Sequence, residues 1–530
     1  MAHYGANTTP YIHPFPNYQL NDLHQAMDYN GSGEPAIRTI TGGATGTTAF
    51  NEPLAVPITP VIQLDALYGL NEQAFETFTA STGTATTANG STLFKVSTGT
   101  GAFGYGVIRS RKALRYRPGQ GAVTRFTANF VNPQADVTLR AGFIAQEQSI
   151  MIGYNGTQFG VLRQNGGKAV IYELNLSAGA GGAETGTVTL NGTAFTVSLS
   201  SGTAQQNAAA IAYRVGGFTG WTVEQVGDKV VFLANDLGPK AGSFSYSSTG
   251  TSAGTMNLRQ AGIANVDNWT YQSDWNIDPL DGTGPSGITI DPSKINVFQI
   301  NFRWLGVGEI RYAMENPESG DIVFFHHEHF SNINTTVHVD NPSFKIGYVA
   351  ANLTAGTITD AFVTGASLLG AIEGLTPTVK YTTAYAASTP SAIAANTFSH
   401  LVSVKNRLTF NDKVNLSTLK LLDATVATDS NDPLIVYIYF RPSTFTANFQ
   451  WANVSTGTIQ SQDAISTTAG TFTGAAEQAV AAFVLQTDGS AQLDLEPYNI
   501  IVPPNSICSL AVYSTSLIQK VSASLIWINE

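Results

Sequence analysis

The chain has 530 residues, of which 43% are hydrophobic and only 12% are charged, and its formal net charge is −11. This length exceeds what one hydrophobic core usually supports, so several domains are expected, and the acidic balance excludes a general nucleic-acid binder, which needs many Lys and Arg side chains. The single cysteine, Cys508, excludes an intramolecular disulfide, and no apolar run reaches the roughly 18 residues of a membrane span.

Residues 1–72 are predicted to form an extended N-terminal arm. Pro10, Pro14 and Pro16 fix φ and remove backbone donors, which disfavours both strands and helices. The Gly- and Thr-rich run "TGGATGTT" (41–48) follows them. Because such an arm has no core of its own, we expect it to lie along another surface, either this chain's own domains or a neighbouring subunit.

Strand patterns dominate residues 73–360. "AVTRFTANF" (122–130) alternates so that one face is largely apolar, as in a half-buried strand. Asn-Gly pairs at 155–156 and 165–166 are typical of two-residue hairpin turns, because both positions accept positive φ. These features predict an antiparallel β-sandwich, whose strands run in a meander to about residue 180.

A small domain is predicted to interrupt this sandwich at residues 183–258. Hairpin patterns at 187–199 and 221–234 flank a helical pattern at 203–215, for which Thr203 is the expected N-cap. Gly-rich segments lie on both sides of the unit. The sequence therefore predicts an inserted ββαββ domain.

Strand patterns return in residues 361–530. "DPLIVYIYF" (432–440) and "KVSASLIWI" (520–528) are rich in β-branched and aromatic residues. We expect a second, C-terminal antiparallel β-sandwich here. The fold class predicted for the whole chain is all-β.

Four segments resemble structural proteins of virions, of the kind known from tailed phages and large DNA viruses: "LRYRPGQGAVTRFTANF" (114–130), "GYNGTQFGVLRQNGG" (153–167), "FRWLGVGEIRYAMENPESG" (302–320) and "NPSFKIGYVAANL" (341–353). The resemblance implies a concanavalin-like jelly-roll sandwich that is carried on a spike, a fibre or the capsid. It implies a location in the virion and work in assembly and surface display rather than catalysis. It brings no site residues with it.

Three of the eight histidines lie in "FFHHEHF" (324–330). Strand alternation places His327 and His329 on one face, and His326 and Glu328 on the other. An H-x-H pair on a strand can bind zinc or iron if a third ligand comes from a neighbouring strand. The alternative is a packed sheet face, and we expect no third ligand to face the pair. The sequence thus predicts no metal and no cofactor.

Two nearby sets of residues bear on this expectation. His338 and Asp321 are the candidate third ligands. Glu309, Glu315 and Glu328 lie on neighbouring predicted strands and would be the carboxylates of a glycan-degrading enzyme, if two of them converged in a cleft. Carboxylates on strands are more often surface residues, so we expect no enzyme.

Aromatic side chains in "DNWTYQSDWNID" (267–278) are candidates for glycan binding. Trp269, Tyr271 and Trp275 lie close to Asn and Asp residues there, and sugars stack on exposed aromatic rings. The alternative is a loop packed over the sandwich edge. A glycan-binding module of a tail fibre or adhesin is therefore the alternative function.

A cluster of basic residues precedes the first sandwich strands. Arg109, Arg111, Arg115 and Arg117 would share one face of a continuous strand, where they could meet an anionic glycan or an acidic neighbouring subunit. The alternative is a solvated strand face with local salt bridges.

The main hypothesis is a structural protein of a virus particle. Its expected partners are other virion proteins, further copies of this chain and a host-surface glycan, with neither nucleic acid nor membrane. Thr-rich, weakly charged sheet surfaces favour a homo-oligomer, with a trimer as the expected state, because hydroxyl groups are less costly to desolvate than charges.

Overall fold

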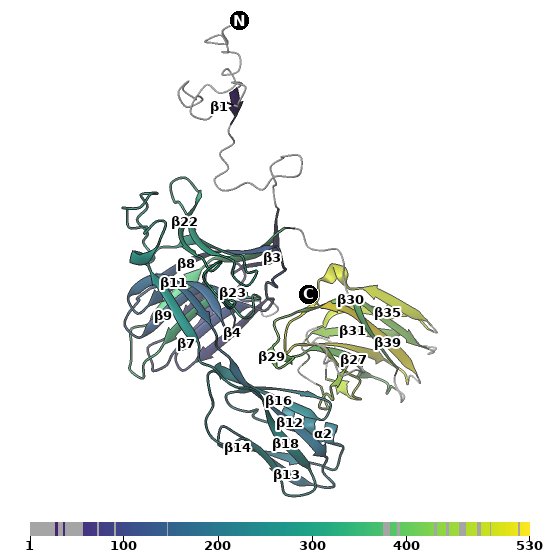
Figure 1. Ribbon diagram of the computed structural model, residues 1–530. Helices are drawn as coiled ribbons and strands as arrows, with labels where there is room; N and C mark the ends of the chain where they lie inside the picture. The colour runs from purple at the N-terminus through teal and green to yellow at the C-terminus, as the bar shows by residue number, and fades with distance from the viewer. Residues whose placement is uncertain are drawn as a thin grey trace. The chain divides into compact units, whose positions relative to one another are not determined.

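The computed structural model describes most of the chain (Figure 1). The described residues are 57–530, without 72–73, 89–91, 146, 375–381, 389–392, 429–431, 441, 443–444, 455–462, 474–478, 488, 518–519 and 530, together with two short strands nearer the N-terminus. These strands pair antiparallel; they are β1 (Met27–Tyr29) and β2 (Pro35–Ile37). The rest of the predicted arm up to residue 56 lies outside the described residues. The chain divides into two units, Met1–Pro57 and Ile58–Glu530.

One sheet of the first sandwich has seven strands and is antiparallel throughout. In spatial order the strands are β19 (Val266–Tyr271), β11 (Gln158–Asn165), β10 (Ser149–Asn155), β9 (Val137–Ile144), β23 (Lys345–Asn352), β7 (Tyr105–Ser110) and β4 (Phe75–Ala80). The hairpin predicted at 155–156 is present between β10 and β11, where Gly156 has φ of +63°.

The second sheet of this sandwich has nine strands. They are β22 (Ile322–Glu328), β21 (Ile310–Glu315), β20 (Asn296–Phe302), β8 (Gly121–Val131), β24 (Phe362–Gly365), β6 (Phe94–Ser97) and β5 (Thr84–Thr87), with β25 (Ser367–Glu373) also paired to β8, and β3 (Ile58–Asp65) paired to β25. A core rich in aromatic rings, including Phe126, Phe143 and Phe298, fills the space between the two sheets. The predicted sandwich is confirmed. The segment 58–65, which we expected to belong to the arm, is instead a strand whose Ile62 side chain is buried in this core.

The inserted domain has two small sheets and a helix. The four-stranded sheet contains β15 (Trp221–Val226), β16 (Lys229–Leu237), β12 (Ala169–Ala178) and β18 (Ala253–Gln260), and the three-stranded sheet contains β14 (Thr193–Leu199), β13 (Glu184–Leu190) and β17 (Ser245–Ser248). The structure places β12 in this domain, although the sequence pattern grouped it with the preceding meander, because both of its partners, β16 and β18, come from later in the chain.

The helix of this domain, α2 (Ala204–Ala212), begins at the predicted N-cap. The Thr203 hydroxyl accepts a hydrogen bond from the Gln206 backbone, and the Gln206 side chain accepts one from the Thr203 backbone, which completes a capping box. This is the one α-helix of the described residues. At nine residues it is far too short to cross a membrane, and no other helix in the described ranges is long and apolar enough to do so.

The C-terminal region forms a second sandwich, as predicted. One sheet contains β26 (Thr382–Ser388), β39 (Val521–Asn529), β30 (Leu419–Thr428), β36 (Ser490–Asp494) and β37 (Ile501–Val502). The other sheet contains β32 (Ala452–Asn453), β33 (Asp463–Ser466), β27 (Thr397–Asn406), β34 (Thr471–Phe472), β38 (Ile507–Ser514), β31 (Leu434–Phe440) and β35 (Ala479–Leu485). A separate hairpin pairs β28 (Thr409–Phe410) with β29 (Lys413–Val414). Cys508 and Trp527 are buried in the core between the two sheets, and burial raises the pKa of the Cys508 thiol to about 12.

The insertion leaves the pairing of the first sandwich intact. β11 ends at Asn165, the chain builds about 100 residues of inserted domain, and β19 then pairs antiparallel with β11, beginning with Asn165 opposite Val266. A bridge between Lys168 and Ile263 continues the pairing toward β12 and β18. The insert is therefore the connection of one long hairpin, and both of its ends leave the sheet side by side.

A fully buried carboxylate joins the insert to the C-terminal sandwich. Glu224 of β15 has no exposed side-chain surface, and its oxygens lie 3.3 Å from Arg407 Nε and 3.8 Å from Lys405 Nζ. The Leu408 backbone N–H donates to Glu224 Oε2 at 2.7 Å. The nearby Trp451 backbone N–H donates to Gln225 Oε1 at 2.9 Å. Burial lowers the pKa of the Lys405 ammonium, which shows that this charge depends on its partner.

Replacing Glu224 with Ala should therefore lower the free energy of unfolding by about 3–5 kcal/mol, because two buried cations would lose their counter-charge. Urea unfolding of the full chain measures this change. The control is E318A, in the exposed turn between β21 and β22, for which a change within about 0.5 kcal/mol is expected. Equal midpoints for E224A and E318A would contradict a role of Glu224 in joining the domains.

Candidate functional site

The seven-stranded sheet turns one face away from the core, and we call this its outer face. Phe143, Ile150 and Val161 point into the core, so strand alternation directs their neighbours in sequence outward. The strand registers place one row of residues across the whole outer face, in the order Phe78, Val107, Val349, Arg140, Gly153, Gly160 and Tyr271. The row begins with apolar side chains and ends with an aromatic ring.

Two glycines interrupt the row between Arg140 and Tyr271. Gly153 and Gly160 lie opposite each other, so two strands carry no side chain at this level. A Cβ atom at Gly153 would come 1.9 Å from the carbonyl oxygen of Leu139, and one at Gly160 would come 2.5 Å from that of Thr270. No larger residue fits there without a shift of the backbone, so the floor between the cation and the ring stays flat.

Arg140 is a half-buried cation on this face. Its Nε atom is buried and has no hydrogen-bond partner among the described residues. Burial lowers the pKa of the guanidinium, while Tyr105 and Asp267 favour its charged form. Arginine stays protonated even so, and a buried N–H group that lacks a hydrogen-bond partner is costly. Arg140 lines a cleft of about 1040 Å³, large enough for an extended ligand.

An aromatic pair lies on the edge strand β19. The rings of Trp269 and Tyr271 are parallel within 6°, with centroids 6.2 Å apart. Both are half-buried, and the Asn155 side chain donates to the Tyr271 hydroxyl at 3.0 Å, which fixes the position of that ring. The register puts Trp269 in the row next to that of Tyr271, beside Leu162. The two rings thus form one patch at the edge of the outer face.

Trp275, the third aromatic residue predicted with them, lies elsewhere. Its side chain is only 6% exposed and packs on Phe325, with ring centroids 4.1 Å apart, and on Phe159. The backbone turns through the 3₁₀-helix Gln272–Asp274 just before it, which breaks the strand alternation. Trp275 therefore belongs to the sandwich core, and no face of its ring is open to a sugar.

The predicted strip of arginines does not form one strand face. β7 ends at Ser110, so only Arg109 among the four lies on it. Arg109 and Lys345 both bind the carboxylate of Glu76 on the outer face, and burial lowers the pKa of Lys345 to about 8 despite that bond. The local salt bridges expected as the alternative are thus present, and both of these cations have an acidic partner.

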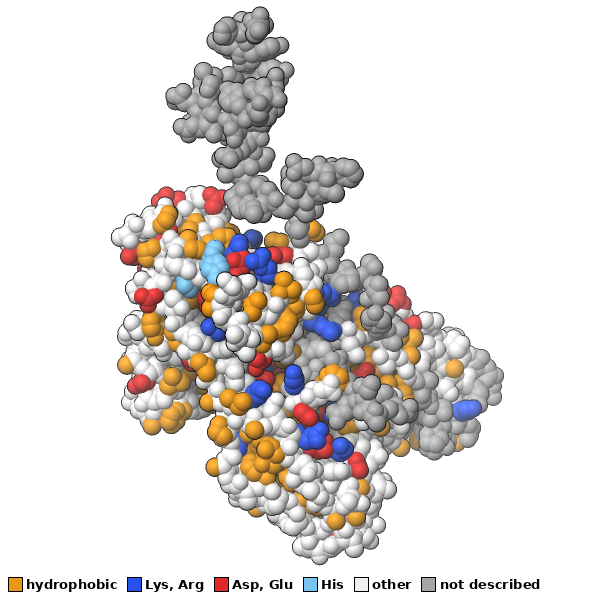
Figure 2. Space-filling model, viewed as in Figure 1, with side chains coloured by type: hydrophobic (Ala, Val, Ile, Leu, Met, Phe, Trp, Pro, Cys, Tyr) orange, Lys and Arg blue, Asp and Glu red, His pale blue; other side chains and the backbone are white. Residues whose placement is uncertain are grey.

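The histidine cluster lies on the β21–β22 hairpin of the nine-stranded sheet. The pairing of Arg311 with His327 puts His327 and His329 on the face turned away from the core, with their ring centroids 5.6 Å apart. Histidine side chains are visible at the surface in Figure 2, beside basic and acidic ones. Glu309 comes to the same place, with a carboxylate oxygen 3.7 Å from His329 Nδ1. The structure therefore brings an acidic side chain to the pair, which the sequence pattern did not predict.

The two residues predicted as third ligands lie apart from this cluster. His338 is buried with its ring stacked on Phe330 at 4.2 Å, and its Nδ1 is 2.8 Å from the Gly306 carbonyl oxygen. Asp321 is an exposed residue in the turn that precedes β22. A register shift next to Tyr312 adds one residue to β22 beside Phe325, and no alternation rule could have located it.

The three carboxylates proposed for glycan cleavage do not converge. Glu328 points toward the core side, where Arg163 Nε and the Tyr312 hydroxyl donate to it at 2.7 and 2.9 Å. Glu309 lies on the opposite face of the hairpin. Glu315 shares that face with Glu309 but is six residues further along the strand, or about 20 Å. No pair of these carboxylates has the spacing of a glycosidase.

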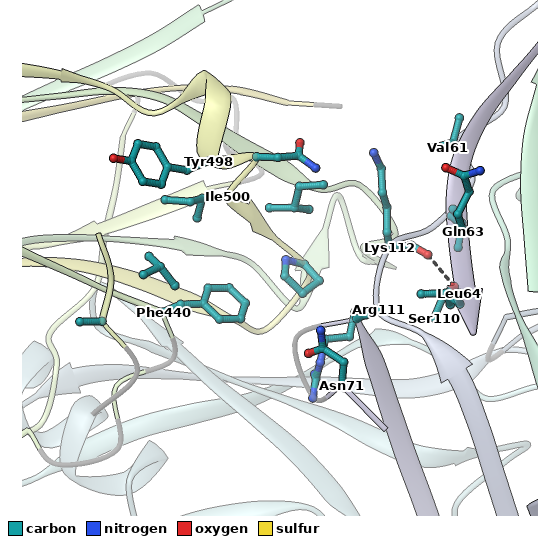
Figure 3. A pocket seen from close by; sticks show the side chains of 17 residues that line it. Val61, Gln63, Leu64, Asn71, Ser110, Arg111, Lys112, Phe440, Tyr498 and Ile500 are labelled. Atoms are coloured by element: carbon teal, nitrogen blue, oxygen red, sulfur yellow. Dashed lines mark hydrogen bonds between the residues drawn. The ribbon is translucent and has the colours of Figure 1, made fainter. Parts of the chain in front are cut away.

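A second cleft, of about 520 Å³, is lined by residues of the first and the C-terminal sandwich (Figure 3). Lys112 and Gln63 are on one side of it, and Phe440 and Tyr498 on the other. The Ser110 hydroxyl donates to the Lys112 carbonyl oxygen at 2.7 Å, which holds the turn after β7. This lining mixes polar and apolar groups, and it includes Arg111 and Lys112.

No family model matches the chain, and no curated protein matches it in sequence. Among solved structures it is distantly similar to legume lectins. Lectin II from Ulex europaeus matches at 9% identity and a TM-score of 0.22, over 59% of this chain and 97% of the lectin. The Bauhinia forficata lectin in complex with GalNAc matches at 7% identity and a TM-score of 0.20, over 59% of this chain and 98% of the lectin. At such low TM-scores the matches carry no argument about what this chain binds.

The different burial of the tryptophans leads to a test of these placements. W275A should lower the free energy of unfolding by about 3–5 kcal/mol, as expected for a large aromatic ring removed from a packed core. W269A, on the edge strand, should cost less than half as much. Urea unfolding of the two variants compares them directly, and a W269A loss equal to that of W275A would contradict the assignment of Trp269 to the surface patch.

Proposed function

We propose that the chain binds an acidic glycan on the outer face of the seven-stranded sheet. The observation that carries the proposal is the Arg140 guanidinium, whose buried Nε has no partner among the described residues and which lines the large cleft. A carboxylate or sulfate group of a ligand would provide the missing anion through a charge-assisted hydrogen bond. Neutral sugars would leave this charge uncompensated, so the proposal is specific for acidic ones.

The neighbouring groups fit the rest of such a ligand. Sugar rings present C–H faces that pack on aromatic rings, and Trp269 and Tyr271 offer parallel rings on the edge strand of the outer face, beyond the lining of the cleft. Tyr271 lies three strands from Arg140, or about 14 Å at the usual strand spacing. A ligand that reached both would be longer than one sugar ring, and the flat floor at Gly153 and Gly160 would let it pass.

Several polar side chains near Arg140 can hydrogen-bond to the hydroxyl groups of a sugar. Gln164 and Ser149 line the cleft with Arg140, and Gln164 donates to Asp267 at 2.8 Å. Amide and hydroxyl groups both donate and accept, and carboxylates accept, so together they can serve the donors and acceptors of sugar hydroxyls. The combination of one cation with an unpartnered Nε, two rings and several small polar groups supports glycan binding better than it supports catalysis.

A glycan array that contains neutral, sialylated, uronate-bearing and sulfated oligosaccharides tests the proposal. The full chain should bind acidic members only. R140Q should weaken binding by about 10–100-fold, which corresponds to the loss of one charged hydrogen bond of about 1.5–3 kcal/mol. Y271A should weaken it by up to about tenfold, through the loss of ring stacking worth about 0.5–1.5 kcal/mol.

Matched controls come from the same chain. Arg115 and Tyr68 are exposed residues that do not belong to the row from Arg140 to Tyr271, so R115Q and Y68A should bind as the unchanged protein does. Circular dichroism should show the same fold for all four variants. Binding that R140Q leaves intact, or binding restricted to neutral sugars, would refute the proposal.

Assembly into a virus particle, expected from the resemblance to virion structural proteins, stays a second candidate. One observation favours self-association: β35, an edge strand of the C-terminal sandwich, has the all-apolar sequence "AVAAFVL", and its Val484 side chain is 55% exposed. Apolar edge strands are sites where another chain can pair. The location in the virion and the trimeric state remain predictions, and display of a host-glycan site on a particle would be consistent with both candidates.

A further inference from the structure

Glu309, His327 and His329 form a compact group of potential metal ligands, which we call the histidine–glutamate cluster. One ligand atom from each residue lies within 4.8 Å of the others. Glu309 directly precedes β21, His327 is near the end of β22 and His329 follows it. Since Ile310 pairs with Glu328, positions 309 and 329 are the next cross-strand neighbours, and the cluster is a product of the hairpin register.

The atoms that would bind a metal are not all taken up by protein contacts. The Nε2 atom of His327 is buried and has no hydrogen-bond partner among the described residues, which is costly for a polar atom in a sheet. Glu309 uses Oε1 for its ion pairs with Arg303, at 3.1 Å, and Arg311. Its other oxygen, Oε2, is the one that faces His329.

The surroundings hold these side chains in place. The Asn276 side chain makes two hydrogen bonds with the backbone of His327 in β22. It accepts one from the His327 N–H and donates one to the His327 carbonyl oxygen, both at 2.9 Å. The two guanidinium groups orient the Glu309 carboxylate, as outer-shell partners of metal ligands commonly do. Their positive charges oppose a bound cation, so the affinity should be modest for a site with three protein ligands.

We infer that the histidine–glutamate cluster binds a divalent transition-metal ion of the zinc class. Two imidazoles and one carboxylate suit Zn²⁺, Co²⁺ or Ni²⁺, whereas Ca²⁺ and Mg²⁺ require more oxygen ligands than Glu309 alone supplies. Three protein ligands leave a fourth position for water or for a group from another molecule. His329 is 57% exposed, so this position opens to solvent. The inference is independent of glycan binding.

The geometry requires only small side-chain movements. Tetrahedral Zn²⁺ with bonds of about 2.0–2.1 Å places its ligand atoms about 3.3–3.4 Å apart. The cluster atoms must therefore approach by about 1.5 Å at most from their present limit of 4.8 Å. Rotation about the side-chain torsions of the exposed His329 and the half-buried His327 can supply this without moving the strands.

Isothermal titration of the full chain with ZnCl₂ tests the inference. The protein should carry no polyhistidine tag and should first be treated with a chelator. The unchanged protein should bind Zn²⁺ at one site per chain, and this site should be lost in H327A and in H329A. Loss of an outer-shell partner of a metal ligand weakens binding by about 10–100-fold, and the loss of His327 or His329 should weaken it by more than that. E309Q should weaken binding as well, and CaCl₂ should give no heat at this site.

The matched control is D321N, because Asp321 belongs to the same hairpin but lies outside the cluster. D321N should bind Zn²⁺ as the unchanged protein does. Saturating Zn²⁺ should also raise the melting temperature of the unchanged protein and of D321N, but not of H329A. Zn²⁺ stoichiometry and affinity that are the same in the unchanged protein and in the H327A/H329A double variant would overturn the inference, because any zinc bound would then reside elsewhere. Absence of any bound Zn²⁺ would overturn it too.

Discussion

The antiparallel pairing of β11 with β19 is the constraint on which the rest of the molecule depends. The chain leaves the sheet at Asn165 and returns at Val266 in register, so a whole domain stands where a two-residue turn would suffice. Without this pairing the seven-stranded sheet would end at β11 and would lack its aromatic edge. The same pairing brings both ends of the insert together, which lets the insert reach the C-terminal sandwich through Glu224 without distorting the sheet.

Local patterns in the sequence predicted much of the fold. Alternating strands such as 122–130, the Asn-Gly turn at 155–156 and the N-cap Thr203 all act over a few residues, and the structure has a strand, a hairpin and a helix at these places. Assignments that depend on distant partners were less accurate. The strand 58–65 was assigned to the arm because its partner, β25, is about 300 residues further along the chain. The strand β12 was assigned to the first sandwich because its partners, β16 and β18, come after it in the sequence.

The candidate sites show the same division between local and distant information. Alternation correctly put His327 and His329 on one face, but it could not show that Glu309 would meet them, because that depends on the register of the hairpin and not on either strand alone. Arg140 gave no signal in the sequence at all. Its significance appears only when four strands are aligned and the row containing Gly153, Gly160 and Tyr271 becomes visible.

The fully buried Glu224 and the half-buried Arg140 have opposite environments, and the contrast supports the functional proposal. Glu224 is surrounded by two cations and a backbone donor, as expected for a charge that stabilises a domain contact. Arg140 has an open cleft before it and lacks a partner at Nε in the described part of the chain. A buried polar atom without a partner costs free energy, and the anionic group of a ligand would supply the hydrogen bond that Nε lacks. Arg109 and Lys345 on the same face differ from Arg140, because both of them pair with Glu76.

Hydrogen–deuterium exchange of the full chain, with and without a saturating uronate-bearing oligosaccharide, tests the central claim most directly. The account predicts slower exchange of backbone amides in β9, β10, β11 and β19, which carry Arg140, the two glycines and the aromatic pair. Exchange in the C-terminal sheet that contains β26 and β39 should be unchanged. Equal exchange in β9, β10, β11 and β19 with and without the oligosaccharide, or protection confined to another part of the chain, would contradict binding on the outer face.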